Sequence, residues 1–334
     1  MGASIAATSY HLPRRVVTNE ELVAEFPDWN VEKIAAKTGI TSRHVAGEDE
    51  YTSDLAAGAA RALEREHGVD LQTVDYLIVC TETPDFYLPS TSLMVHDLLG
   101  LPNTCGATDI TLGCSGYVYG LGLAKGLIDS GQAARVLLIT ADTYNRLLNP
   151  QDRSVRTIFG DGAAASLVTA SADGGGVHSF VYGSEGAGGR ALVVPNGGMR
   201  PGSRYPDASP DARGLVASGY DLYMDGPEVF NFTLRVVPPT VEKVLEKAGL
   251  QRDDIDTWIF HQANAYMLGH LRRKLDIPAD RFLVDMADVG NTVSSTIPIV
   301  LARAAERGGL QPGSRSLLLG FGVGLSWAGA IVDW

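Results

Sequence analysis

At 334 residues, the chain is long enough for one large α/β unit or two fused domains of ordinary size. Its 45% hydrophobic and 20% charged residues are typical of a globular protein and exclude a disordered chain. A formal net charge of −12 argues against nonspecific binding to nucleic acid or to anionic membranes. Because no apolar run approaches the ~20 residues of a membrane span and the start lacks a signal-like segment, we expect a cytoplasmic protein without a membrane partner.

Residues 74–140 alternate short apolar strands with helices whose apolar residues recur three and four positions apart. Strands are predicted over 74–80, 107–111 and 135–140, with helices over 90–100 and 115–131. The same order recurs later, and its predicted parts are a strand over 255–261, a helix over 265–278, a strand and turn over 281–290, a helix over 292–309 and a closing strand over 314–320. Such alternation predicts a mostly parallel sheet with helical crossovers.

The repeated order indicates two pseudo-equivalent halves that pack together, an N-terminal half over 1–170 and a C-terminal half over 171–334. The second half begins with a loop-rich stretch, 171–225, which is read equally well as a surface excursion or as a lid or pocket wall. Cys114 would open a helix in the first half, and Asn291 would open the matching helix in the second. His261 ends a predicted strand, where open α/β sheets place their sites. A pseudo-twofold relation would bring the three residues to one cavity.

The cysteines Cys80, Cys105 and Cys114 are too few for a disulfide framework and are expected to be reduced thiols. Cys80 ends an apolar run and is expected to be a buried core residue. Cys105 has no assigned role. Cys114 lies in a Gly-Cys-Ser-Gly turn before a helix, where the helix dipole and backbone N–H groups are expected to lower its pKa.

Each of the three candidate residues also has an ordinary structural interpretation. A cysteine before a helix is more often a packing residue, a histidine at a strand end is more often structural, and Asn291 suits a helix N-cap. Together, Cys114, His261 and Asn291 fit a nucleophile assisted by two hydrogen-bonding groups. Cysteine hydrolases use similar residue types, so these types alone leave the reaction open.

Five segments place the chain beside a known family: DITLGCSGYVYGL, FGDGAAAS, HQAN, GNTVSSTIP and GFGVGLSWAGAIV. They closely resemble the beta-ketoacyl-acyl carrier protein synthase III family, in order and spacing, from the first strand to Trp334. The resemblance implies a thiolase-like α/β fold, in which two βαβ-rich halves form a layered α-β-α-β-α sandwich. It also implies a homodimer, no tightly bound cofactor or metal, and coenzyme A thioesters as substrates.

The resemblance assigns the chemistry residue by residue. Cys114 would attack an acyl-CoA and hold the acyl group, while His261 and Asn291 would hydrogen-bond the carbonyl of a malonyl-type thioester as it loses CO2. The backbone N–H groups of Cys114 and Val323 would form the oxyanion site, although glycine is usual at the second position. Phe321 matches an aromatic gate beside the cysteine. The predicted product is a beta-ketoacyl thioester.

The same resemblance predicts the substrate channel. Arg153 matches an arginine at the adenine end of coenzyme A, Asn264 matches a pantetheine contact, and Lys37 and Trp29 are further candidates for binding coenzyme A. The residues expected to shape the acyl pocket are Leu88, donated across the dimer interface, and the wall residues Tyr144 and Phe159. Ordinary core packing is an equally good interpretation of the last three.

The chain departs from the family pattern at three places. Lys33 replaces the usual tryptophan ahead of the Thr-Gly-Ile segment, while Trp29 is offset by four residues. Tyr266 and Asn231 replace an arginine and a lysine that help relatives dock an acyl carrier protein. The basic run 272–274 is either a substitute docking patch or a solvated helix face.

The departures and the composition leave the pathway and the acceptor open. Six lysines against twenty-one arginines indicate a GC-rich coding bias, typical of bacteria with dedicated condensing enzymes for secondary metabolites. We therefore expect decarboxylative condensation in a specialised pathway. The alternatives are an acyltransferase that uses an alcohol or amine acceptor without decarboxylation, and a non-catalytic partner subunit.

Overall fold

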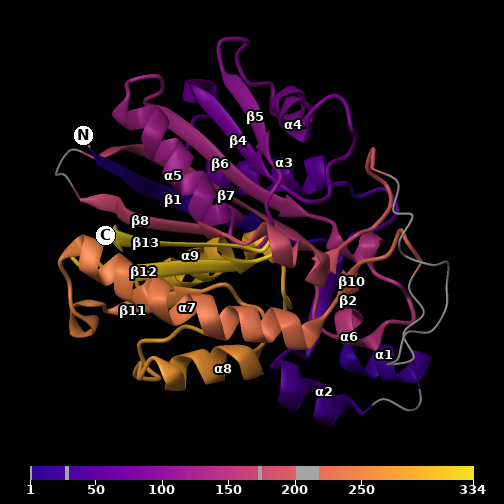
Figure 1. The fold of residues 1–334 in the computed structure, drawn as a ribbon. Helices are drawn as coiled ribbons and strands as arrows, with labels where there is room; N and C mark the ends of the chain where they lie inside the picture. The colour runs from indigo at the N-terminus through magenta and orange to yellow at the C-terminus, as the bar shows by residue number, and fades with distance from the viewer. Residues whose placement is uncertain (1, 27–29, 172–174, 201–217) are drawn as a thin grey trace.

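The computed structural model describes residues 2–26, 30–171, 175–200 and 218–334 (Figure 1). Two main sheets dominate it. The five strands of the first sheet are, in order across the sheet, β1 (Gly2–His11), β7 (Gly162–Ser171), β6 (Arg135–Asp142), β4 (Tyr76–Cys80) and β5 (Gly106–Ile110). The four strands of the second are β11 (Thr257–Phe260), β12 (Arg315–Gly322), β13 (Ser326–Asp333) and β8 (Gly176–Ser184).

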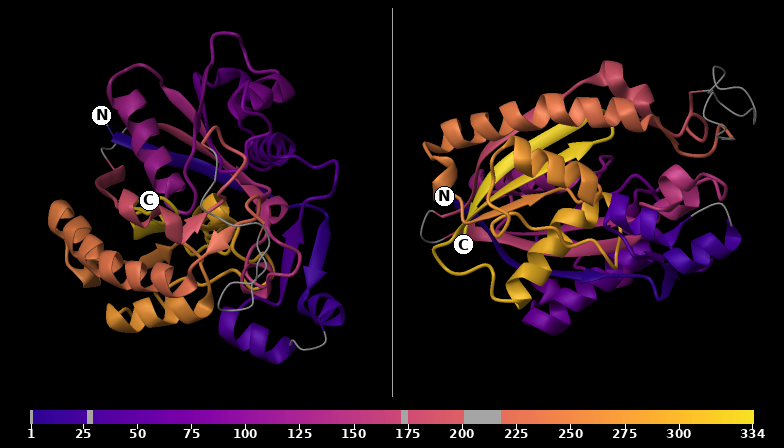
Figure 2. Two further views of the ribbon diagram at one scale, coloured as in Figure 1. Left: turned by 45° about the vertical axis from the view of Figure 1, so that its right-hand side comes forward. Right: turned by 90° about the horizontal axis from the view of Figure 1, so that it is seen from below.

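Helices cover both faces of each sheet, which confirms the predicted five-layer arrangement (Figures 1 and 2). The middle layer consists of α5 (Gly116–Asp129) and α9 (Thr296–Glu306), whose apolar residues share one core with strands of both sheets. On the outer face of the first sheet lie α3 (Thr52–His67) and α4 (Thr91–Leu99). On the outer face of the second lie α7 (Gly226–Ala248) and α8 (Ala265–Lys274).

Smaller elements surround the end of the molecule at which the middle helices begin. They are β2 (Arg15–Thr18), α1 (Asn19–Glu25), α2 (Val31–Thr38), β3 (Ser42–Val45), α6 (Arg153–Arg156), β9 (Leu192–Val193) and β10 (Tyr223–Met224). β2 pairs with β3, and β9 pairs with β10. Short 3-10 turns connect these elements, including one over Val293–Ser295 ahead of α9. In the described part of the chain, no helix combines the length and the apolar character that a membrane crossing requires.

The parallel pairing predicted for the repeated units is confirmed, but it does not extend across the whole of either sheet. Parallel pairing joins β4 to β5, β4 to β6 and β11 to β12, but β1, β7, β8 and β13 all pair antiparallel. The chain continues past the predicted closing strand through a tight turn into β13, which returns alongside β12. A hairpin of this kind needs no helical crossover, so helix–strand alternation cannot reveal it.

Two other strand predictions need correction. The segment 281–290 forms no regular strand. A single parallel bridge pairs Phe282 with Trp258 of β11. Farther along, the carbonyl of Ala287 accepts hydrogen bonds from the N–H groups of Thr41 and Ser42. The stretch 171–225 was expected to be rich in loops, yet it contains the nine-residue β8, which lies against β13. Residues 201–217 of that stretch lie outside the described residues.

Candidate active site

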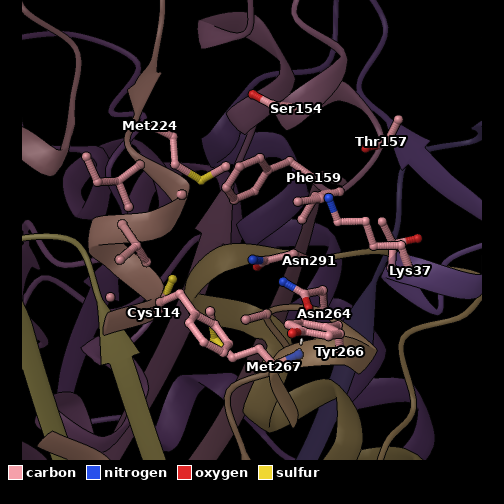
Figure 3. A pocket seen from close by; sticks show the side chains of 18 of the residues that line it. Lys37, Cys114, Ser154, Thr157, Phe159, Met224, Asn264, Tyr266, Met267 and Asn291 are labelled. Atoms are coloured by element: carbon pink, nitrogen blue, oxygen red, sulfur yellow. Dashed lines mark hydrogen bonds between the residues drawn. The ribbon is translucent and has the colours of Figure 1, made fainter. Parts of the chain in front are cut away.

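The ends of three elements bring Cys114, His261 and Asn291 to one cavity of about 770 Å³. Cys114 lies in the turn just before α5, His261 directly follows β11, and Asn291 lies shortly before α9. Figure 3 shows Cys114 and Asn291 facing this cavity from neighbouring walls, with the Lys37 side chain farther along it. The topology therefore brings Cys114 to two side chains that lie more than 140 positions later in the sequence.

Close packing of β12 against the cysteine turn fixes the sulfur. A Cβ atom on Gly320 would lie 2.6 Å from the carbonyl oxygen of Cys114, and one on Gly322 would lie 2.9 Å from its Sγ. Real Cβ atoms do not approach this closely, so both positions require glycine for the strand to pass beside the turn. Cys114 keeps 7% of its surface accessible, and it lines the cavity.

Two backbone N–H groups point at the same sulfur. The amides of Cys114 and Val323 hydrogen-bond its thiolate form, which lowers the pKa of the thiol. Both would remain aimed at this place if an acyl group were attached to the sulfur, where a tetrahedral oxyanion would need donors. The valine at position 323 does not obstruct this arrangement, because the contact uses only its backbone.

Other influences outweigh those amides, and the pKa of Cys114 is raised well above its ordinary value. Burial is the largest cause, followed by the carboxyl groups of Glu82 and Asp142. The expectation of a lowered pKa is therefore wrong for the resting protein. The position before a helix is visible in the sequence, but the burial of the thiol and the two acids near it are not. Thiolate formation here requires a proton acceptor or the arrival of substrate.

His261 is buried, and burial lowers its pKa to about 3, so the imidazole is neutral at physiological pH. Its Nδ1 atom lies 2.7 Å from the hydroxyl of Thr296, the first residue of α9. The ring stands edge-on to Phe321, with centroids 5.6 Å apart. These contacts hold the ring with Nε2 directed toward the side chain of Asn291.

The amide of Asn291 is oriented by its own backbone surroundings. Its Oδ1 accepts a hydrogen bond of 2.9 Å from the N–H of Val293, which leaves the Nδ2 group 3.5 Å from Nε2 of His261. The backbone of Asn291 bonds to Ile158 and Gly160, which bracket Phe159. Asn291 thus precedes the helix, but its side chain caps a turn and presents N–H groups to the cavity.

Aromatic side chains line the cavity near the sulfur. Tyr144 and Phe159 are both buried, with ring centroids 4.9 Å apart, and both line the cavity together with Phe321. Leu192 and Met224 also line it (Met224 is labelled in Figure 3). This wall suits an apolar acyl chain.

Polar side chains lie farther along the same cavity. Lys33, Lys37, Arg153 and Asn264 all line it. Asn264 also caps α8 by accepting a hydrogen bond of 2.9 Å from the N–H of Met267. The expected contact Trp29 lies outside the described residues.

Leu88 does not reach the cavity of its own chain. It is 86% exposed, in a loop where Phe86 and Tyr87 are also exposed, at 55% and 70%. Tyr266, which replaces the arginine that the resemblance would place there, lines the cavity and packs near Phe230, with ring centroids 5.8 Å apart.

The basic run 272–274 ends α8, and two of its members are engaged locally. Arg272 donates to the carbonyl of Ile277, and Lys274 donates to the carbonyl of Leu234. Arg273 is exposed. The run therefore holds the segment after α8, ties α8 to the middle of α7 and directs one cation to solvent.

Three residues around the site were not anticipated: Thr296, which contacts His261, and the acids Glu82 and Asp142. Thr296 could have been found from the sequence, because it lies in the GNTVSSTIP segment together with Asn291 and begins a helix. Nothing in the sequence singled out the two acids, because a carboxylate that follows an apolar strand usually lies in solvent.

The fold and the site together define a class: a two-sheet thiolase-like protein with a buried cysteine, histidine and asparagine at one cavity. Two family models match the chain, described as 3-oxoacyl-[acyl-carrier-protein (ACP)] synthase III over residues 108–186 and as its C-terminal part over residues 245–334. The chain belongs to the beta-ketoacyl-acyl carrier protein synthase III family of condensing enzymes.

Similar proteins extend the match over the whole chain. Beta-ketoacyl-[acyl-carrier-protein] synthase III 3 of Streptomyces coelicolor is 41% identical over 326 residues, which are 97% of this chain and 94% of that protein. A solved 3-oxoacyl-(acyl-carrier-protein) synthase III is 46% identical, with a TM-score of 0.97 and full coverage of both chains. A 3-oxoacyl-(acyl-carrier protein) synthase from Burkholderia xenovorans is 37% identical, with a TM-score of 0.92 over 99% of this chain and 94% of that one.

Proposed function

We propose that this enzyme transfers an acyl group from an acyl-CoA to Cys114 and condenses it with a malonyl-type thioester, with loss of CO2. The observation that carries the proposal is the pair of nitrogen atoms 3.5 Å apart, Nε2 of His261 and Nδ2 of Asn291, which face the cavity that Cys114 also lines. Two donors this close can bind one carbonyl oxygen. The negative charge of a decarboxylating thioester collects on that oxygen.

In the first step, the Cys114 sulfur attacks the acyl-CoA carbonyl and the CoA thiolate leaves. The backbone N–H groups of Cys114 and Val323 stabilise the tetrahedral oxyanion. Tyr144 and Phe159 border the space for the acyl chain. The result is an acyl-cysteine whose thioester carbonyl remains on the same two amides.

In the second step, the malonyl thioester binds with its carbonyl oxygen at His261 and Asn291. Donation from Nε2 requires that Nδ1 accept a hydrogen bond. The hydroxyl of Thr296 lies 2.7 Å from Nδ1 and can donate to it in place of its longer bond of 3.2 Å to the carbonyl of Val293. The carboxylate leaves as CO2, and the enolate carbon attacks the acyl-cysteine. An amide at 291 suits this step better than a carboxylate, which would repel the enolate.

Delivery of the substrates uses the outer part of the cavity. Lys37 and Arg153 offer cations to the phosphates or adenine of coenzyme A, and Asn264 offers an amide to the pantetheine arm. We propose a homodimer in which the exposed Leu88 enters the partner's acyl pocket, because a side chain that is 86% exposed gains from burial. The malonyl group would arrive on coenzyme A or on an acyl carrier protein, in a specialised biosynthetic pathway.

Incubation with an acyl-CoA panel and malonyl thioesters tests the proposal. Intact-protein mass spectrometry should show one acyl group on wild-type protein and none on C114A, and the second substrate should then release CO2 and a beta-keto product. A C114A protein that is acylated as fully as wild type would show that Cys114 is not the nucleophile.

The alternative acceptor, an alcohol or amine, has one supporting observation. This chain has Tyr266 and Asn231 at two positions where the family resemblance implies cations that help bind an acidic carrier protein. An ester or amide product, formed from acyl-Cys114 without CO2, would establish this second reaction in place of condensation.

A further inference from the structure

Glu82 is a half-buried acid near the reactive cysteine that no step above uses. It lies two residues after the end of β4, and its Oε2 atom is buried with no hydrogen-bond partner among the described residues. A methyl group placed on Gly113 would overlap both Glu82 Oε2 and a methyl group of Val323. The carboxyl group therefore packs against the residues that flank and face Cys114, including the valine that supplies an oxyanion amide.

The titratable groups that face Glu82 come from each element packed against it. They are Asp142 at the end of β6, Tyr144 in the following turn, Cys114 ahead of α5, and Cys80 at the end of its own strand. Tyr144 hydrogen-bonds the Glu82 carboxylate. No cation is among these groups, so the charge of Glu82 has no ionic partner in the described structure.

The two neighbouring acids differ in their hydrogen bonding. Asp142 accepts hydrogen bonds from the Ser294 hydroxyl at 2.6 Å, from the Glu82 N–H at 2.8 Å and from the Thr81 hydroxyl at 3.3 Å. Its oxygens are occupied by structural contacts. The free acceptor of the pair is Oε2 of Glu82, which is the atom packed against Gly113.

Among the described residues, the imidazole of His261 is the other candidate base for the thiol. His261 has a pKa lowered to about 3 and has Nδ1 at Thr296, so it is a poor proton acceptor. Burial, and then the charge of Asp142, raise the pKa of Glu82 to about 8. A base in that range is matched to a thiol whose own pKa is raised.

We infer that Glu82 is a catalytic residue that takes the thiol proton of Cys114 when the sulfur is acylated and returns it when the sulfur is released. In the first half-reaction, the S–H bond breaks, the proton moves to Oε2, and the sulfur forms a bond to the acyl carbon. The CoA thiolate leaves and takes a proton from solvent. After CO2 is lost and the new C–C bond forms, Cys114 leaves as a thiolate and recovers the proton from Glu82.

This assignment explains why an acid is tolerated at this place. While the acyl group is attached, Glu82 is a neutral carboxylic acid, so an apolar chain is not held beside a buried charge. Tyr144 bonds the carboxyl group, but Oε2 makes no hydrogen bond with the described residues and so remains available to take a proton. The inference rests on the proposed acylation of Cys114.

The test compares wild-type protein, E82Q, E82D and the remote control E242Q, in which an exposed carboxylate of α7 is changed. The rate of Cys114 acylation by an acyl-CoA is followed by rapid quench and intact-protein mass spectrometry from pH 6 to pH 10, with circular dichroism and a melting curve for each variant. The glutamine side chain of E82Q keeps the shape of glutamate but accepts no proton between pH 6 and pH 10.

We expect E82Q to be acylated about 100-fold more slowly than wild type at pH 7, the order of effect that a general base supplies. Its rate should keep rising with pH, while the wild-type rate levels off once Glu82 is ionised. E82D should recover part of the rate and the wild-type pH profile, and E242Q should match wild type. If E82Q is unfolded, the pH profile of E82D decides: loss of the wild-type plateau overturns the inference.

Two results separate this inference from the proposed function. If E82Q is acylated as fast as wild type or faster, Glu82 acts only by raising the thiol pKa, and the inference is overturned while the acyl-enzyme stands. If wild-type Cys114 takes up no acyl group from any acyl-CoA, the proposed function itself fails.

Discussion

Substitution of Gly322 by alanine tests how closely β12 must approach the reactive sulfur. The added Cβ would lie 2.8 Å from the Cβ of Cys114 and 2.9 Å from its Sγ. Ordinary contacts between such atoms are about 3.5–4.0 Å, so the strand and the cysteine turn must separate by roughly 0.7–1 Å. A misplacement of about 1 Å at reacting atoms can lower a rate about 100-fold.

The same substitution should cost little stability compared with its effect on the rate. Overpacking of this kind costs about 1–3 kcal/mol, which leaves the protein folded. G126A is the matched control: it lies in α5, the helix that Cys114 precedes, and no atom lies within 4 Å of its added Cβ. Alanine there should add about 0.5–1 kcal/mol of stability and leave the rate unchanged.

The assay combines urea denaturation with the rate of Cys114 acylation by an acyl-CoA. We expect G322A to be folded, less stable than wild type and about 100-fold slower in acylation. A G322A protein that acylates within threefold of wild type would show that the close approach of β12 does not position the sulfur.

Three further predictions concern the neighbours of Cys114. N291D should keep acylation but lose condensation by about 100-fold or more, because a carboxylate repels the enolate; CO2 release from acyl-enzyme measures this. T296V should slow condensation about 10-fold without affecting acylation, since His261 loses the partner of Nδ1; equal loss in both steps would contradict it. The raised pKa of Glu82 means that its native state holds a proton that the unfolded state releases between about pH 4.5 and pH 8. The free energy of unfolding of wild type should therefore fall relative to that of E82Q by up to about 1.4 kcal/mol per pH unit across that range. Urea denaturation at several pH values measures both, and a difference between the two proteins that does not change with pH would refute the prediction.

Much of the site could be predicted because topology is visible in local patterns. The strand before His261 and the helices after Cys114 and Asn291 are strongly periodic, and ends of neighbouring elements meet at one edge of a sheet. The layered sandwich follows from the repeat of these units.

The remainder depends on contacts between distant segments, which local patterns do not encode. β8 follows a glycine-rich stretch and becomes a strand through pairing with β13. The segment 281–290 has strand-like residues but turns away to bond with Thr41 and Ser42. The pKa of Cys114 is raised rather than lowered because tertiary packing buries the thiol and also brings the acids Glu82 and Asp142 near it.

A single turnover of acyl-enzyme tests the central claim most directly. Wild-type protein acylated at Cys114 and freed of excess acyl-CoA is mixed with a malonyl thioester, and acyl-cysteine, CO2 and product are quantified together. We predict that each acyl group lost from Cys114 appears in a beta-ketoacyl product with one CO2 released. Loss of the acyl group without CO2, or CO2 release that leaves the acyl-cysteine intact, would contradict the account.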